Sequence, residues 1–219
     1  MNAITNLLPT TKRLGNKRAQ ETLFDLRAAL ETGDVSRLPD GLRDQAARMA
    51  QATTKIAAGA EIARISELMT LAQFGAGSLG TAVADAFEDP GAAPAMEALF
   101  ISRFLIETVF ASKQRPYLLP GDLLRQNDID RGTAAWPAAE PVFSILIERA
   151  ARAIDAAAAG RTAIGSPSLR KLFDRDHATT RRQIRKLTGK NPDSPRARLT
   201  ALDRIIISLT IRLHLRGTP

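Results

Sequence analysis

Glu107 is the residue whose type and setting point most directly to chemistry. It lies in an apolar run with Phe104, Leu105 and Phe110, where a carboxylate needs either a partner or a role. Arg103 precedes it by four residues and can pair with it if the run is helical. Two interpretations therefore stand side by side, a functional carboxylate and a structural ion pair.

Other acidic residues have spacings that deserve the same test. Asp85 and Asp89 are four residues apart and, with Glu88, could reach one Mg²⁺ from a helix. A solvated helix end is the favoured interpretation, because acidic side chains are mostly exposed. Asp40 and Asp44 share the spacing but flank a turn in a polar stretch. The sequence therefore predicts no metal site.

Glycines at 75, 77 and 80 spell G-x-G-x-x-G. A predicted helix precedes them, whereas a dinucleotide site needs a strand there, so nucleotide binding is disfavoured. Each glycine inside a helix costs about 1 kcal/mol against alanine. Three in six residues therefore indicate a kink or the close approach of a neighbouring helix.

The fold class follows from periodicity. Apolar residues recur at helical spacing and no stretch alternates as a strand would, so we expect an all-α, single-domain helical bundle. The predicted helices cover residues 20–32, 41–60, 60–87, 94–110, 122–126, 141–159, 168–188 and 198–216. Residues 1–19 carry four basic and no acidic side chains and are expected to form a flexible basic arm before a 20–219 domain. Residues 198–216 are apolar round most of the helix, which predicts burial.

The net charge of the chain limits the kinds of partner that it would attract. The 219 residues carry a net charge of +8, which attracts diphosphates, acidic lipid surfaces, nucleic acid or acidic proteins. The densest basic run comprises Arg170, Lys171, Arg175, Arg181, Arg182, Arg185 and Lys186. It has no helix-turn-helix or zinc pattern beside it, so a solvated helix face is favoured over specific nucleic-acid binding.

The stretch from Arg115 to Leu124 reads Arg-Pro-Tyr-Leu-Leu-Pro-Gly-Asp-Leu-Leu. Its two prolines break a helix, and Pro-Gly-Asp can open the next one. With the segments 72–80, 105–107, 127–129 and 181–209 in their order, it resembles the squalene/phytoene synthase family. The resemblance implies an isoprenoid synthase fold, N-terminally shortened, and head-to-head transfer on prenyl diphosphates with Mg²⁺ held by two Asp-rich motifs.

Departures from the family pattern shape the functional expectation. Alignment on Pro120 puts Glu107 at the first Asp of the second motif, and Phe110 and Ala111 at its Glu and Asp. The chain is therefore similar to the degenerate branch of the family, which includes a respiratory complex I assembly factor. The expected role is non-catalytic binding without a cofactor, in the cytoplasm or peripherally on the inner membrane. The expected partner is an acidic protein, a membrane surface, or a prenyl or lipid ligand.

The resemblance also implies a ligand site, with Glu107 as the remnant of the second Asp-rich motif. Its expected members are Phe74, Gly77, Arg103, Glu107, Phe110, Arg115 and Tyr117. Two alternatives stay open. One is a prenyl-diphosphate transferase with an altered Mg²⁺–diphosphate site, and the other is a basic helical nucleic-acid binder.

Overall fold

The computed structural model describes the backbone of residues 4–9 and 15–216 and confirms the all-α class, with no strand in those ranges. The α-helices are α1 (Lys17–Thr32), α2 (Asp40–Ala57), α3 (Ile65–Ala72), α4 (Ser78–Ala86), α5 (Ala93–Phe110), α6 (Gly121–Gln126), α7 (Glu140–Ala159), α8 (Pro167–Leu187) and α9 (Ala201–Arg216). Short turns are η1 (Thr5–Leu7), η3 (Gln73–Gly77), η4 (Pro90–Ala92), η5 (Pro116–Leu118), η6 (Arg131–Thr133), η7 (Arg161–Ala163) and η8 (Pro195–Ala197).

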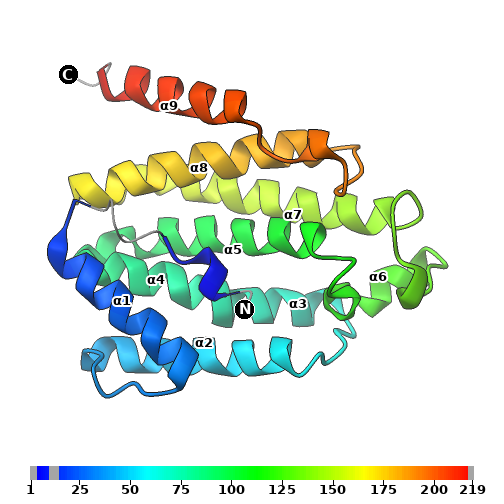
Figure 1. Ribbon diagram of the computed structural model, residues 1–219, viewed down its shortest axis with the longest axis horizontal. Coiled ribbons are helices and arrows are strands. Elements are labelled where there is room, and N and C mark those ends of the chain that lie inside the picture. The colour runs from blue at the N-terminus through cyan, green and yellow to red at the C-terminus, as the bar shows by residue number, and fades with distance from the viewer. Residues whose placement is uncertain (1–3, 10–14, 217–219) are drawn as a thin grey trace.

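Helix α5 runs through the middle of the bundle (Figure 1). It packs against α7 on one side and against α4 on the other. Helices α1 and α2 lie beyond α4, and α8 packs against both α7 and α5. Helix α9 forms the outermost layer and packs on α8. Residues on α5 are therefore placed between the two halves of the molecule.

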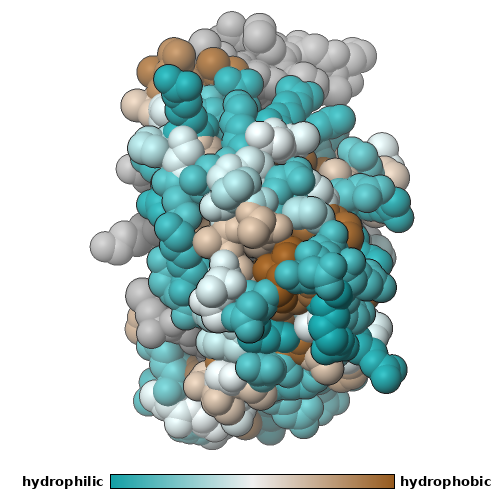
Figure 2. Space-filling model, turned by 90° about the vertical axis from the view of Figure 1, so that its right-hand side faces the viewer, coloured by the Kyte–Doolittle hydropathy of each residue, from teal (hydrophilic) through white to brown (hydrophobic). Residues whose placement is uncertain are grey.

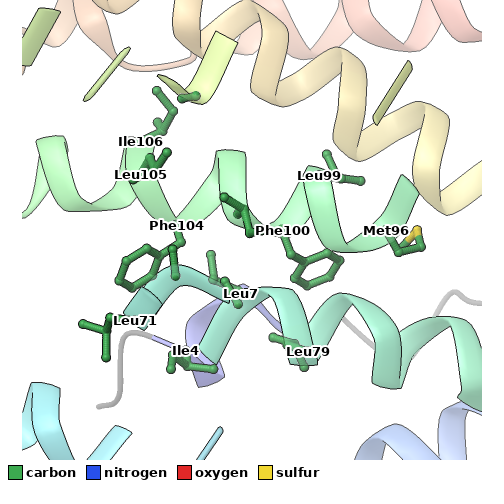
Figure 3. Packing of buried hydrophobic residues seen from close by; sticks show 14 of the residues in the cluster. Ile4, Leu7, Leu71, Leu79, Met96, Leu99, Phe100, Phe104, Leu105 and Ile106 are labelled. Carbon is green, nitrogen blue, oxygen red and sulfur yellow. The ribbon is translucent and has the colours of Figure 1, made fainter. Parts of the chain in front are cut away.

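Helix α5 is buried over most of its surface, and its large side chains form the centre of the core. Figure 3 shows Phe100 and Phe104 pointing from α5 toward the α3–α4 side, where Leu71 and Leu79 lie. Leu105 and Ile106 lie on other sides of α5. Packing on several sides requires apolar residues on several sides, which explains the continuous apolar run read in the sequence.

The glycine-rich segment joins α3 to α4 through the π-helical turn η3. A Cβ on Gly75 would collide with the Ile4 side chain. A Cβ on Gly80 would lie 2.5 Å from the backbone oxygen of Met96, where α4 crosses α5. The prediction of a local helix distortion and of close neighbours is thus confirmed, and the glycines here serve packing.

The N-terminal segment differs from the expected flexible arm where it is described. Ile4, Leu7 and Leu8 are buried in the core, and Figure 3 shows Ile4 and Leu7 beside Leu71 and Phe104. Helix α1 already begins at Lys17. The prediction of a flexible arm rested on four basic residues at positions 12–18 and gave too little weight to the apolar residues at positions 4–8. Residues 1–3 and 10–14 lie outside the described residues, and the division of the chain into an arm and a domain stays a prediction.

The predicted burial of the last helix is wrong for residues 201–208, the part of α9 whose side chains the structure describes. On α9, Leu202 is 65% exposed and Ile205 is 56% exposed, whereas Asp203 and Ile207 are buried. The helix has α8 on one side only. A helix with apolar residues on all sides is buried only if other elements pack against every side, and in the described part of the fold α8 packs against one side of α9.

Within the described ranges, no helix is both long enough and apolar enough to cross a membrane.

Candidate functional site

Glu107 lies in the last turn of α5, between two hollows. The first hollow, of about 200 Å³, is lined by Asn6, Phe104, Glu107, Thr108, Ala111, Gln114, Arg115 and Leu118. The second hollow, of about 460 Å³, is lined by Glu107, Phe110, Ala111, Gln114, Gln183, Arg198, Leu199 and Arg204. It brings the end of α5 together with α8 and the start of α9. Glu107 contributes to both hollows and is the sole acidic residue among these lining residues.

The Glu107 carboxyl has a raised pKa because the surrounding protein displaces part of its water. The positive charges of Arg103, Arg115 and Arg198 oppose this effect without cancelling it. Its side chain is exposed, so it reaches solvent inside a concave surface. The apolar neighbours of Glu107 in the sequence favour a position facing the interior, whereas the structure places it at the mouth of the hollows.

Arg103 does not form the ion pair that the sequence offered as a structural explanation of Glu107. Its Nη1 lies 3.0 Å from Asp176 Oδ2 on α8. The guanidinium carbon also lies 4.9 Å from the centre of the Phe100 ring, a favourable cation–π position. Arg103 therefore ties α5 to α8, and Glu107 keeps a carboxyl without an ion pair among the described residues.

The hollows suit an anionic group better than a metal ion. Arg115, Arg198 and Arg204 supply positive charge at their walls. Phe110 and Ala111, where the family resemblance would place acids, line the second hollow without an oxygen ligand. Mg²⁺ binds deprotonated carboxylates, usually several together, and Glu107 supplies a single carboxyl whose pKa is raised. The residues present do not fit an Mg²⁺–diphosphate site.

The fold places some of the other predicted ligand-site residues at the hollows and the rest elsewhere in the molecule. Phe110 and Arg115 join Glu107 at the hollows. The Tyr117 hydroxyl instead donates to the Ile56 oxygen at 3.0 Å. Phe74 is 45% exposed on η3, and Gly77, at the end of η3, faces Glu97 of α5. A ligand role for any of these residues stays a prediction.

The other acidic residues considered as metal ligands do not converge on one site, and three of them bind separate partners. Asp85 accepts a hydrogen bond from Gln45 at 2.8 Å, and Asp89 accepts one from the Ser166 backbone at 2.8 Å. Glu88 pairs with Arg18. Asp40 and Asp44 are exposed on α2. Across the described ranges, no group of three or more His, Asp or Glu side chains could hold a metal ion.

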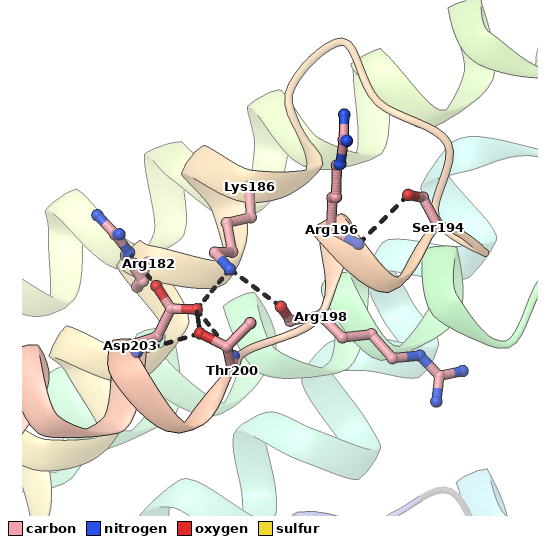
Figure 4. A network of polar contacts seen from close by, with 7 residues as sticks. All are labelled: Arg182, Lys186, Ser194, Arg196, Arg198, Thr200 and Asp203. Carbon is pink, nitrogen blue, oxygen red and sulfur yellow. Dashed lines mark hydrogen bonds and ion pairs between the residues drawn. The ribbon is translucent and has the colours of Figure 1, made fainter.

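The basic run on α8 is largely engaged within the molecule. Arg175 pairs with Asp176 and Arg181 with Asp155. Arg182 and Lys186 both bind Asp203 of α9 (Figure 4). Arg170 donates to the Ile164 oxygen. The contacts of Arg181, Arg182 and Lys186 join α8 to α7 and α9, and such engagement leaves fewer basic side chains for the phosphates of a nucleic acid.

Sequence reasoning missed Gln183, Arg198 and Arg204 as members of the second hollow. They lie at least 76 positions from Glu107, and no spacing relates them to it. The only signal was the positive charge of the segment before the last apolar helix.

Comparison with solved structures identifies the fold. The chain superposes on a crystal structure of a dehydrosqualene synthase in complex with ligand, with a TM-score of 0.70 over 98% of this chain and 91% of that chain. The chain has an isoprenoid synthase fold. This isoprenoid synthase fold is shared at 12% sequence identity, a level at which the likeness shows the fold alone. No protein-family model matches the sequence, and no curated protein matches it.

Proposed function

We propose that this protein acts by binding an amphipathic anionic ligand, of the prenyl diphosphate or lipid class, and does not transfer prenyl groups. One observation carries the proposal: the hollows at Glu107 combine a single carboxyl of raised pKa with three arginines. Arginine recognises phosphate oxygens through directed hydrogen bonds. The apolar faces of Phe110 and Leu199 in the second hollow fit the first carbons of a hydrocarbon chain.

The missing acidic neighbours support binding over catalysis. Ionisation of a prenyl diphosphate breaks its C–O bond and builds negative charge on the departing diphosphate, and a bound Mg²⁺ would stabilise that charge. Here Arg198 and Arg204 line the second hollow, and a single carboxyl, whose pKa is raised, lies beside them. Such a site holds an anion without a metal ion.

Calorimetric titration with farnesyl diphosphate tests the proposal. We expect binding in the absence of Mg²⁺, with little change when Mg²⁺ is added. The double variant Arg198→Gln/Arg204→Gln should weaken binding at least about tenfold, equivalent to about 1.4 kcal/mol. Arg196→Gln is the matched control, because Arg196 is also exposed but its side chain points away from that of Arg198 (Figure 4). Equal weakening by both variants would show a general charge effect and no site.

A transferase with an altered site is the second candidate, favoured by the shared isoprenoid synthase fold. Its signature is turnover of farnesyl diphosphate with Mg²⁺ to a head-to-head product. If turnover occurs and Glu107→Ala abolishes it, the binding proposal is replaced. Product analysis by chromatography distinguishes the two candidates.

A role in assembling a respiratory complex is the protein-binding form of the same proposal. It is suggested by the resemblance of the sequence to the degenerate family branch, and an acidic protein partner would match the net charge of +8. Specific nucleic-acid binding receives no comparable support, because most of the α8 basic run contacts groups within the fold.

A further inference from the structure

Within residues 201–208, where the side chains of α9 are described, the outer face carries large apolar residues exposed to solvent. Leu202, Ile205 and Ile206 are 65%, 56% and 38% exposed, and their spacing places them on one side of the helix. In Figure 2 a cluster of apolar atoms lies at the top of the molecule, beside the atoms drawn in grey. Single exposed apolar residues are ordinary, whereas a contiguous group marks a contact surface.

The polar contacts of α9 hold this face outward. Asp203 lies on the inner side, where it accepts hydrogen bonds from Arg182 at 2.9 Å and from the Thr200 hydroxyl at 2.7 Å, and pairs with Lys186 (Figure 4). These donors hold the Asp203 pKa far below its usual range. An ordinary surface helix turns its apolar side inward. Here the ion pairs of the buried Asp203 with Arg182 and Lys186 occupy the inner side, so the exposed apolar side chains face outward.

The charge around α9 is one-sided. From Pro195 to Pro219 the sequence contains five arginines and a single acidic residue, Asp203, which is buried and paired. Arg198 and Arg204 are exposed. Both line the second hollow, which lies beside α9. An anionic surface is the complementary partner.

We propose that α9 lies flat on an anionic lipid bilayer, with Leu202, Ile205 and Ile206 inserted at the boundary between headgroups and acyl chains. An apolar helix face joined to excess basic charge is the pattern of interfacial helices. The bilayer proposal rests on α9 and does not depend on a ligand in the hollows. Because Arg198 and Arg204 line the second hollow beside α9, a bilayer contact through α9 would bring that hollow close to the lipid headgroups.

Vesicle co-sedimentation of the full chain tests the bilayer contact. We expect binding to phosphatidylcholine vesicles that contain phosphatidylglycerol, weaker binding to pure phosphatidylcholine, and release at high salt. The triple variant Leu202→Ser/Ile205→Ser/Ile206→Ser should lower partitioning at least about tenfold, since the inserted apolar area is lost. Phe24→Ser is the matched control, because Phe24 is 63% exposed on α1, and it should bind as the wild type does.

A second measurement covers the case in which the triple variant does not fold. The chain contains no cysteine, so Ile205→Cys and Phe24→Cys each provide a single labelling site. A polarity-sensitive dye at position 205 should shift to shorter wavelength on anionic vesicles, whereas the dye at position 24 should not.

Several outcomes would overturn the proposal. They are equal partitioning of the triple variant and the wild type, equal loss in Phe24→Ser, or no shift of the dye at position 205. A concentration-dependent dimer that the triple variant dissociates, without vesicle binding, would assign the face to a second copy of the chain. Farnesyl diphosphate titration in the absence of vesicles separates the two proposals, because the triple variant should retain that binding.

Discussion

At the scale of single residues, the properties of Glu107 come from its surroundings. Its carboxyl touches solvent, yet protein atoms on both sides raise its pKa. Phe110 and Ala111 follow on the same turn and supply no second carboxylate. A neighbouring acid would have held a metal ion or shared a proton, whereas a lone acid facing arginines can bind or release a proton as an anion arrives.

Glu107→Gln should stabilise the protein at neutral pH. The folded state raises the pKa of Glu107 above its unfolded value of about 4.3, so stability falls as pH rises from there through the folded pKa. The amide removes this loss. We expect the free energy of unfolding to rise by less than about 1 kcal/mol at pH 7, because solvent screens the exposed carboxyl.

Urea unfolding at pH 7 and near pH 4 measures this effect, and the gain should disappear at the lower pH. Glu31→Gln, at an exposed position near the end of α1, controls for the change in net charge. A loss of stability in Glu107→Gln at pH 7 would mean that the arginines hold the carboxylate ionised.

At the scale of the elements, the crossing of α4 over α5 depends on a missing side chain. Gly80 allows the backbone of Met96 and Glu97 to approach so closely that an added Cβ would lie 2.5 Å and 2.6 Å from their atoms. Backbone atoms cannot rotate aside as a flexible side chain can. This crossing sets where α5, and with it Glu107, lies in the bundle.

Gly80→Ala should therefore destabilise the protein by about 2 kcal/mol, although alanine is the better helix former by about 1 kcal/mol. Gly41→Ala is the control, because Gly41 lies in α2 with nothing within 4 Å of its added Cβ. It should be neutral or gain up to about 1 kcal/mol. Thermal unfolding of both variants checks the difference, and a gain in both would contradict the close crossing.

At the scale of the whole molecule, one arginine joins segments that are far apart in the sequence. Arg131 donates to the backbone oxygens of Pro116 at 2.9 Å and Ile62 at 3.0 Å, and also to Leu119. Its side chain is 18% exposed. It thus holds the proline-rich joint after α5 against the connection between α2 and α3, where Ile62 donates to the Tyr117 oxygen at 2.9 Å.

Arg131→Met should lower the free energy of unfolding by about 2–4 kcal/mol, because three buried or half-buried carbonyls lose a charged donor. Arg131→Lys should recover part of the loss, since lysine keeps the charge but not the planar fork. Arg152→Met is the control: this exposed arginine pairs with Glu148 within α7, and its loss should cost below about 0.5 kcal/mol. Urea unfolding measures all three, and similar values for Arg131→Met and Arg152→Met would contradict the joining role.

The helical architecture follows from the sequence alone, because apolar periodicity and glycine spacing are local properties of the chain. The sequence also shows that Glu107 lacks acidic companions at 110 and 111. Only the tertiary structure decided that Glu107 faces Arg198 and Arg204, that Arg103 pairs with Asp176, and that the apolar side of α9 points outward. These outcomes depend on contacts between residues far apart in the chain, which no local pattern encodes. The joint at residues 115–124 shows both contributions: its prolines predicted a helix break, and the side chain of Arg131 places that break in the bundle.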